Sequence, residues 1–124
     1  MKAIHTNNAP AAIGPYSQAI EVNGFVFASG QIPIDPKTGN FVEGGIKEQT
    51  AQALTNAGNI LKEAGTDLAH VVKTTVYLAD MADFAAMNEV YATFFSQPFP
   101  ARSAVAVKEL PKGARVEVEV LAAK

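Results

Sequence analysis

The residue with the clearest chemical potential in this chain is Arg102, which stands in the small and apolar run Phe99–Val107. A guanidinium is always charged, and its planar fork of N–H donors fits a carboxylate or phosphate through two parallel hydrogen bonds. Ala104 and Ala106 share one side of a strand with Arg102 and leave room beside it. Arg102 is therefore a candidate anion-binding residue. The alternative is an ion pair with one of the chain's own acids, or exposure to solvent at a strand end.

A second group of charges lies in the run Arg115–Val120, where charged residues and valines alternate strictly. This alternation predicts a strand with three valines on the core face and Arg115, Glu117 and Glu119 on the other. A charged face is ordinarily solvated. If association with another copy covers it, a carboxylate there loses its water and becomes a candidate acid or base for a water molecule.

The elements that must hold these residues begin with a hairpin and a long helix. Two short β-prone runs, Gln18–Val22 and Phe25–Ser29, flank Asn23-Gly24, and this combination predicts a tight hairpin because both turn residues tolerate positive φ. Apolar residues spaced three and four apart predict a helix over Ile46–Ala64, with Gly65 at its carboxyl end.

The second half of the chain is predicted to form a strand, a helix and two further strands. The β-branched run Val71–Leu78 predicts a strand, and Asp80 is placed to cap the helix that follows. Strands over Arg102–Val107 and Arg115–Leu121 then close the domain around the turn Leu110–Gly113. The helix carries an apolar stripe that we assign to the core, made of Phe84, Met87, Tyr91 and Phe94.

This order of elements predicts an α+β fold in which two helices pack on one face of a mixed sheet. The other face also keeps apolar groups, because Phe25 and Phe27 share one side of a strand and Val71 is expected on the same side as Lys73. Such a face is most simply buried by copies of the same chain, which predicts a closed homo-oligomer. We expect a neighbouring copy to cover this bare face and to enclose Arg102.

Length and composition restrict the classes of protein. With 124 residues, 48% hydrophobic and 18% charged, the chain is predicted to be a single domain over residues 1–124. The absence of cysteine excludes thiolate chemistry, and two separated histidines predict no metal site. A net charge of −2 without a basic block disfavours general nucleic-acid binding. No run suits a signal peptide or a membrane span, so we expect a soluble, cytoplasmic protein.

Five separated segments occur in an order that is characteristic of one family, and together they cover most of the chain. They are Gly14–Ala19, Ser29–Pro33, Lys73–Leu78, Phe99–Ser103 and Leu110–Lys112. On these segments the chain resembles the RidA/YjgF (Rid) family of reactive-intermediate deaminases, also called endoribonuclease L-PSP or translation-inhibitor proteins. The resemblance implies a chorismate-mutase-like α+β fold and a homotrimer with a central barrel. It also implies that ligand sites lie between the subunits.

The resemblance further implies an enzymatic activity that needs no cofactor. This activity is the hydrolysis of 2-imino or 2-enamino acids, such as 2-iminobutanoate and 2-iminopropanoate, to 2-oxo acids and ammonia. In this reading Arg102 grips the substrate carboxylate and Glu117 is associated with the catalytic water, as base, acid or water anchor. The remaining substrate-binding positions implied by the resemblance are Tyr16, Ser29, Gly30, Phe84, Asn88, Ser103 and Ala104. The family often has cysteine where this chain has Ala104, so any role of that position must use the backbone.

Two other functions remain open at this point. The same cleft in a non-catalytic protein would bind or sense small 2-oxo acids. The older family name implies a ribonuclease or translation inhibitor, which the charge balance disfavours. Tyr16 also has a structural alternative, because its ring can simply pack on the sheet.

Overall fold

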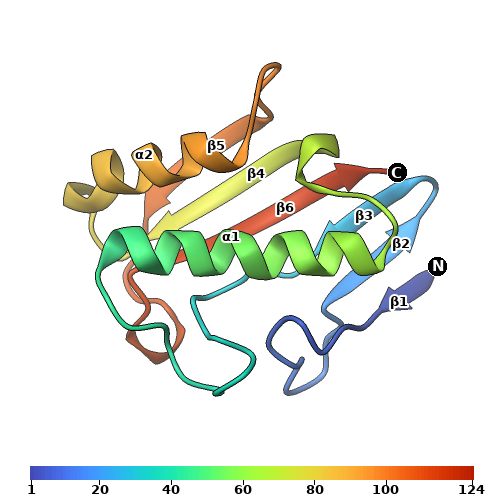
Figure 1. Ribbon diagram of the computed structural model, residues 1–124, viewed down its shortest axis with the longest axis horizontal. Coiled ribbons are helices and arrows are strands. Elements are labelled where there is room, and N and C mark those ends of the chain that lie inside the picture. Colours follow the sequence, from blue (N-terminus) through green and yellow to red (C-terminus); the bar gives the residue numbers. More distant parts are fainter.

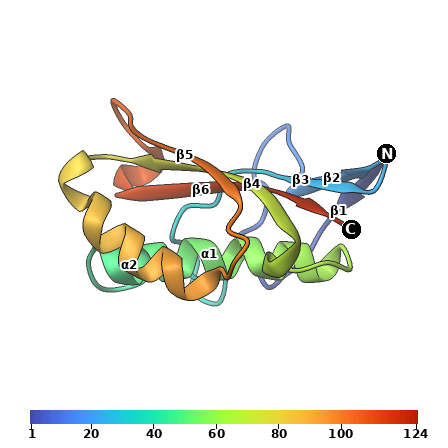
Figure 2. The same ribbon diagram turned by 90° about the horizontal axis from the view of Figure 1, so that it is seen from above.

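A single six-stranded sheet with two α-helices organises the chain, and the computed structural model describes all residues from 1 to 124 (Figure 1). The helices are α1 (Ile46–Glu63) and α2 (Phe84–Phe94). The strands are β1 (Lys2–Ile4), β2 (Ala19–Val22), β3 (Phe25–Ala28), β4 (Val71–Leu78), β5 (Ala101–Ala106) and β6 (Val116–Ala123). They lie in the order β1-β2-β3-β6-β4-β5, and only β4 and β5 are parallel. Figure 2 shows both helices on one face of the sheet, which confirms the predicted α+β arrangement.

The hairpin and the long helix form where their sequence signals lie. Asn23 and Gly24 have φ values of 50° and 80°, so the left-handed turn expected between β2 and β3 is present. At the start of α1 the Glu48 carboxylate accepts a hydrogen bond from the Gly45 amide at 2.8 Å. Beyond the helix Gly65 has φ +87°, a conformation that favours glycine at a helix end.

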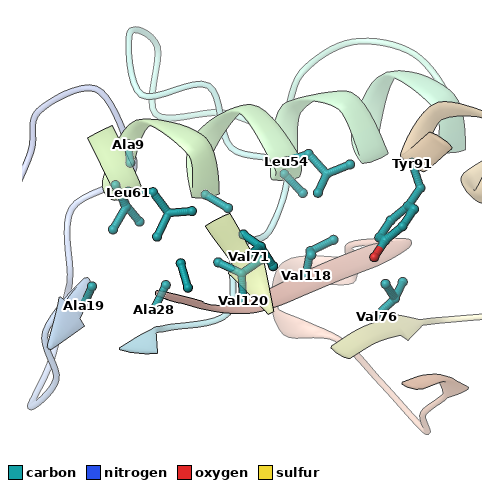
Figure 3. Packing of buried hydrophobic residues seen from close by; sticks show 14 of the residues in the cluster. Ala9, Ala19, Ala28, Leu54, Leu61, Val71, Val76, Tyr91, Val118 and Val120 are labelled. Carbon is teal, nitrogen blue, oxygen red and sulfur yellow. The ribbon is translucent and has the colours of Figure 1, made fainter. Parts of the chain in front are cut away.

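The core lies between α1 and the middle of the sheet. Leu54 and Leu61 of α1 are fully buried and point toward β6, where Val118 and Val120 face them (Figure 3). The valines of β6 therefore take the core side, as their alternation predicts. Since β6 runs between β3 and β4, its opposite face carries Glu117 and Glu119 in the middle of the uncovered side of the sheet.

Three local features differ from the prediction. Strand β1 was not predicted, because three residues are too few to show a periodic pattern. Asp80 caps a short 3-10 turn over Met81–Asp83 by accepting from the Ala82 amide, and α2 begins after that turn. A β-bulge between Val71 and Lys73 shifts the register, so Val71 is buried in the core and not on the face of Lys73.

The uncovered face of the sheet is apolar at both ends and charged in between. Phe25 and Phe27 on β3 and Val105 on β5 remain between 41% and 46% exposed, which is unusual for large apolar groups on regular strands. Lys73 and Glu119 lie among them on the adjacent strands. The expected trimer with a central barrel remains a prediction, and this face is the surface that it would bury.

Two buried amides hold the loops that flank the sheet. Gln18 accepts a hydrogen bond from the Thr6 amide and donates to the carbonyls of Thr6 and Pro10, so it clamps the segment after β1. Asn56 of α1 donates to the carbonyls of Ile32 and Ile34, at 3.2 and 2.9 Å. The loop after β3 is thereby fixed to the helix layer.

Removing the Asn56 amide tests this loop anchor. We expect Asn56→Ala to lower the free energy of unfolding by about 1–3 kcal/mol, because two partly buried carbonyls lose the donor that the buried Asn56 side chain supplies. Chemical denaturation measures the change. Asn59→Ala is the matched control, since Asn59 on the same helix also donates to a carbonyl, that of Asn8, but in an exposed position. An equal loss of unfolding free energy in both variants would show that the buried Asn56 stabilises the fold no more than the exposed Asn59 does.

Candidate active site

Arg102 lies on β5 against helix α2, on the face of the sheet that the helices cover. Its Nη1 donates a hydrogen bond to Oδ1 of Asn88 at 2.6 Å. The carbon at the centre of the guanidinium stands 4.7 Å from the ring centroid of Tyr91 and 5.5 Å from that of Phe84. The group is thus held by two aromatic rings and one amide.

The guanidinium opens into a cavity of about 390 Å³ at the edge of the sheet. The cavity is lined by Asn88, Tyr91, Ala92, Phe99, Pro100 and Arg102. None of the four ion pairs of the chain includes Arg102. A cation that has aromatic neighbours and no carboxylate of its own chain is suited to receive an anion from outside.

Glu117 lines a second cavity, of about 370 Å³, on the opposite side of the sheet. Its walls come from the loop before β2, the loop after β3 and the turn before β6, and include Tyr16, Gly30, Gln31, Lys112 and Glu117. Gly30 lies so close to Glu117 that an added Cβ would overlap the carboxylate, with the Glu117 Cδ at 2.9 Å. Position 30 therefore has to be glycine, because the Glu117 carboxylate occupies the space that a side chain would need.

The electrostatic environment of Glu117 favours its protonated form more than water does. Burial raises the pKa of this carboxyl, and the neighbouring charge of Glu119 raises it further. The pKa of Tyr77, the partner of Glu117 on β4, is also raised by burial, then by Glu119 and Glu117. A carboxyl whose pKa is raised in this way is suited both to accept and to return a proton during a reaction.

The loop after β3 organises this second cavity through backbone contacts. The Ser29 hydroxyl donates to the Ser17 carbonyl at 2.6 Å, so it joins the end of β3 to the loop that carries Tyr16. Gln31 exchanges two backbone hydrogen bonds with Val118, next to Glu117. Tyr16 is 54% exposed and its ring lines the cavity mouth, so it is not packed into the core.

Two residues lie away from the places expected for them, and a third lies where alternation puts it. Ser103 points away from Arg102 and accepts a hydrogen bond from Lys73 Nζ on the uncovered face. Ala104 lies on the side of Arg102, as predicted, and its side chain packs against the core. Arg115 precedes β6 and pairs with Asp83 at 2.7 Å, so it does not share a surface with Glu117.

Arg102 and Glu117 lie on opposite faces of one sheet. Arg102 is in register with Thr74 of β4, whose side chain is buried under the helices, whereas Glu117 is in register with Tyr77 on the other face. The expectation that Arg102 belongs to the bare face is wrong for this reason. One chain thus carries two separate candidate sites, one around the Arg102 cation and one around the Glu117 carboxyl.

Several residues that line these cavities were not identified from the sequence. Tyr91 was assigned to the core stripe of α2, yet its ring also forms a wall beside Arg102. Phe99 and Lys112 carry no periodic signal, because Phe99 lies in the irregular segment before β5 and Lys112 in the short 3-10 turn Pro111–Gly113. Tyr91 lies one turn of helix from Asn88, and this spacing was the available clue.

No cluster of three or more His, Asp or Glu side chains is placed to hold a metal ion. Neither helix is long and apolar enough to cross a membrane.

The sequence matches the family model described as Endoribonuclease L-PSP over residues 6–124, so the chain belongs to this family. A mouse relative named 2-iminobutanoate/2-iminopropanoate deaminase is 54% identical over 98% of this chain and 90% of its own length. Relatives from goat, cow, rat and human carry the same enzyme name, and others are called RutC family proteins. The predicted membership in a family that contains imine deaminases is confirmed.

Solved structures agree with this assignment. RidA from the Antarctic bacterium Psychrobacter sp. superposes with a TM-score of 0.96 at 45% identity, and the match covers all of both chains. The E. coli protein TdcF with bound serine superposes with a TM-score of 0.94 at 39% identity, over 100% of this chain and 99% of TdcF. The predicted RidA/YjgF fold is therefore confirmed.

The raised pKa of Glu117 gives a prediction that needs no assay of activity. We expect Glu119→Gln to lower the pKa of Glu117, because the variant removes a neighbouring negative charge, while burial still keeps this pKa above its ordinary value. A ¹³C NMR titration of the Glu117 carboxyl measures the shift. Glu63→Gln, at the end of α1, is the control and leaves the Glu117 titration unchanged. An unaltered midpoint in Glu119→Gln would contradict the assigned cause.

Proposed function

We propose that this chain is a hydrolytic deaminase of 2-imino and 2-enamino acids, with 2-iminobutanoate and 2-iminopropanoate as substrates. We further propose that it works as a homotrimer, with Arg102 of one subunit and Glu117 of the next facing each other across each junction. The observation that carries this proposal is the separation of the two candidate sites on opposite faces of one sheet. The names of the mammalian relatives support the substrate class.

Arg102 supplies the grip on the substrate carboxylate. One nitrogen of its fork is held by Asn88 and the remaining N–H groups are available for a bidentate contact. Serine, which is bound in the structure of TdcF, carries a carboxylate on the carbon next to its nitrogen, as a 2-imino acid does. The apolar walls formed by Ala92 and Phe99 suit the short side chain of such an acid.

Glu117 supplies proton transfer to and from water. Its carboxylate takes a proton from a water molecule as the water oxygen bonds to carbon 2 of the protonated imine, which gives a tetrahedral carbinolamine. The carboxyl returns that proton to the nitrogen, the C–N bond breaks, and ammonia leaves with the electron pair. The Glu117 carboxylate takes the remaining hydroxyl proton, which gives the 2-oxo acid, and releases that proton to solvent. The raised pKa of Glu117 suits a group that must both accept and return a proton.

The remaining assigned residues act around these two groups. Tyr16 closes the mouth of the candidate site around Glu117 and Gly30 lets the backbone approach the reacting atoms. Ser29 holds the loop in place through its bond to Ser17. Phe84 supports the guanidinium, and Ala104 contributes backbone only, as does Ser103, whose hydroxyl is bound by Lys73.

The assembly follows from the surface that one chain leaves uncovered. Phe25 and Phe27 need burial, and three copies that bring their uncovered faces together would enclose a central barrel. The edge strand β5 of each copy then lies beside the next copy's loop after β3. No cofactor is needed, because a protonated imine is already electrophilic and the site has only to orient it and supply a base.

The family description also names an endoribonuclease, and this activity is less well supported by the residues. The chain has twelve acidic and ten basic residues, and the candidate site around Glu117 would repel a phosphate backbone. The alternative is a non-catalytic protein that senses 2-oxo acids. It would bind 2-oxobutanoate through Arg102 and release no ammonia from 2-iminobutanoate.

Mixed trimers test both the activity and its location. Arg102→Gln and Glu117→Gln are each expected to reduce deamination at least about 100-fold, because one lacks the carboxylate grip and the other the base. When the two variants are co-expressed with different tags and purified through both, each mixed trimer contains one junction with an intact pair. We expect about a third of the wild-type ammonia release to return.

The control is a trimer in which every copy carries Arg102→Gln, prepared by co-expressing this variant with each of the two tags and purifying through both. We expect this control to release no ammonia. A site built within one chain would leave the mixed trimers as inactive as each variant alone. Such a result, or full activity of either variant, would refute the proposed site. Binding of 2-oxobutanoate by the wild-type protein without any ammonia release would support the sensor.

Gly30→Ala separates activity from stability. The added Cβ collides with the end of the Glu117 side chain and not with backbone, so the carboxylate moves and the fold stays. We expect kcat for 2-iminobutanoate to fall at least about tenfold, while the melting temperature changes by no more than about 3 °C. Steady-state kinetics and thermal unfolding measure the two effects. A wild-type kcat in this variant would show that Glu117 takes no part in the reaction.

A further inference from the structure

Helix α2 supports Arg102 with a tyrosine that is itself immobilised. The Tyr91 ring lies 4.7 Å from the guanidinium carbon, closer than the ring of Phe84 at 5.5 Å. Tyr91 is only 5% exposed, whereas Phe84 is partly exposed at the first residue of the helix. Of the two rings, Tyr91 is therefore the fixed support.

Two contacts fix the Tyr91 ring from directions away from the cavity. Its hydroxyl shares a hydrogen bond of 2.8 Å with the Thr74 hydroxyl, and Thr74 is fully buried. Phe95 packs against the ring with a centroid distance of 4.6 Å. Thr74 is also the residue of β4 that lies in register with Arg102. The ring is thus anchored to the strand next to the one that carries the guanidinium.

The guanidinium makes two kinds of contact. Its central carbon lies over the Tyr91 ring, which attracts the charge without accepting a hydrogen bond as an amide oxygen does. The N–H groups lie in the plane of the guanidinium, and one of them is taken by Asn88. The remaining donors are left for an anion. Contact with the ring restricts the Arg102 side chain without competing for those donors.

We propose that Tyr91 is a positioning residue for substrate binding, which holds the plane of Arg102 so that its unused N–H groups face the cavity, with Thr74 fixing the tyrosine in turn. This inference rests on the proposed function, because it takes the substrate carboxylate as the ligand of Arg102. It assigns Tyr91 a role in affinity for the acid. The proton transfers at Glu117 remain independent of it.

The test compares Tyr91→Leu, Tyr91→Phe and Phe95→Leu in the full-length protein. We expect Tyr91→Leu to raise KM for 2-iminobutanoate and Kd for 2-oxobutanoate about tenfold, with kcat within about threefold of wild type. Tyr91→Phe keeps the ring and restores most of the affinity. Phe95→Leu removes one of the two contacts that fix the Tyr91 ring but keeps the ring itself, so we expect its KM to rise by no more than about threefold, well below the rise in Tyr91→Leu.

Thr74→Val keeps the ring and removes its hydrogen-bond partner, and it replaces Tyr91→Leu if that variant does not fold. We expect it to raise KM and Kd about threefold in the same direction. Equal rises in KM for Tyr91→Leu and Phe95→Leu, or no rise in either Tyr91→Leu or Thr74→Val, would overturn the inference. Arg102→Gln with wild-type KM and kcat would instead refute the proposed function, so the two failures are distinguishable.

Discussion

The structure depends on one geometric constraint, which is that alternate residues of a strand point to opposite faces of the sheet. Arg102 points to the same face as its register partner Thr74, which the helices cover. Glu117 points to the same face as its register partner Tyr77, which is uncovered. A single chain can therefore not place both groups on one small molecule. The two incomplete cavities and the exposed aromatic residues of β3 have a common explanation if each surface is completed by another copy.

Each candidate site also carries a charge that its own chain leaves uncompensated. Arg102 lies against aromatic rings, and its side chain donates its one hydrogen bond to the neutral amide of Asn88. Glu117 is partly buried beside a glycine and a like-charged neighbour, which raises its pKa. Such arrangements cost stability in an isolated chain and are typical of sites where a ligand completes the interaction. The cost is moderated because both groups keep some contact with solvent.

The sequence predicted the elements with strong local signals and missed those set by tertiary contacts. Asn23-Gly24 and the apolar spacing of α1 are local chemistry, and both formed as predicted. Strand β1 depends on pairing with β2, and the bulge before Lys73 reverses the side of Val71, which alternation alone cannot show. For the site, the sequence identified Arg102 and Glu117 as the chemically important residues. The face of the sheet to which Arg102 points depends on the pairing of β5 with β4, which the sequence does not show. Tyr91 looked like a core residue because it is one, with its other surface on Arg102.

The proposed reaction sets a further demand on how copies meet. In a 2-imino acid the carboxylate and the imine carbon are joined by a single bond, so Arg102 and Glu117 must approach within the length of one small molecule. Arg102 lies on β5, the edge strand, and beside the residues that lead into it from α2. Glu117 opens toward loops at the rim of its own sheet. The edge of one copy must therefore reach the rim of the next, which favours a closed ring over two sheets stacked flat, because only the ring repeats that contact at every junction.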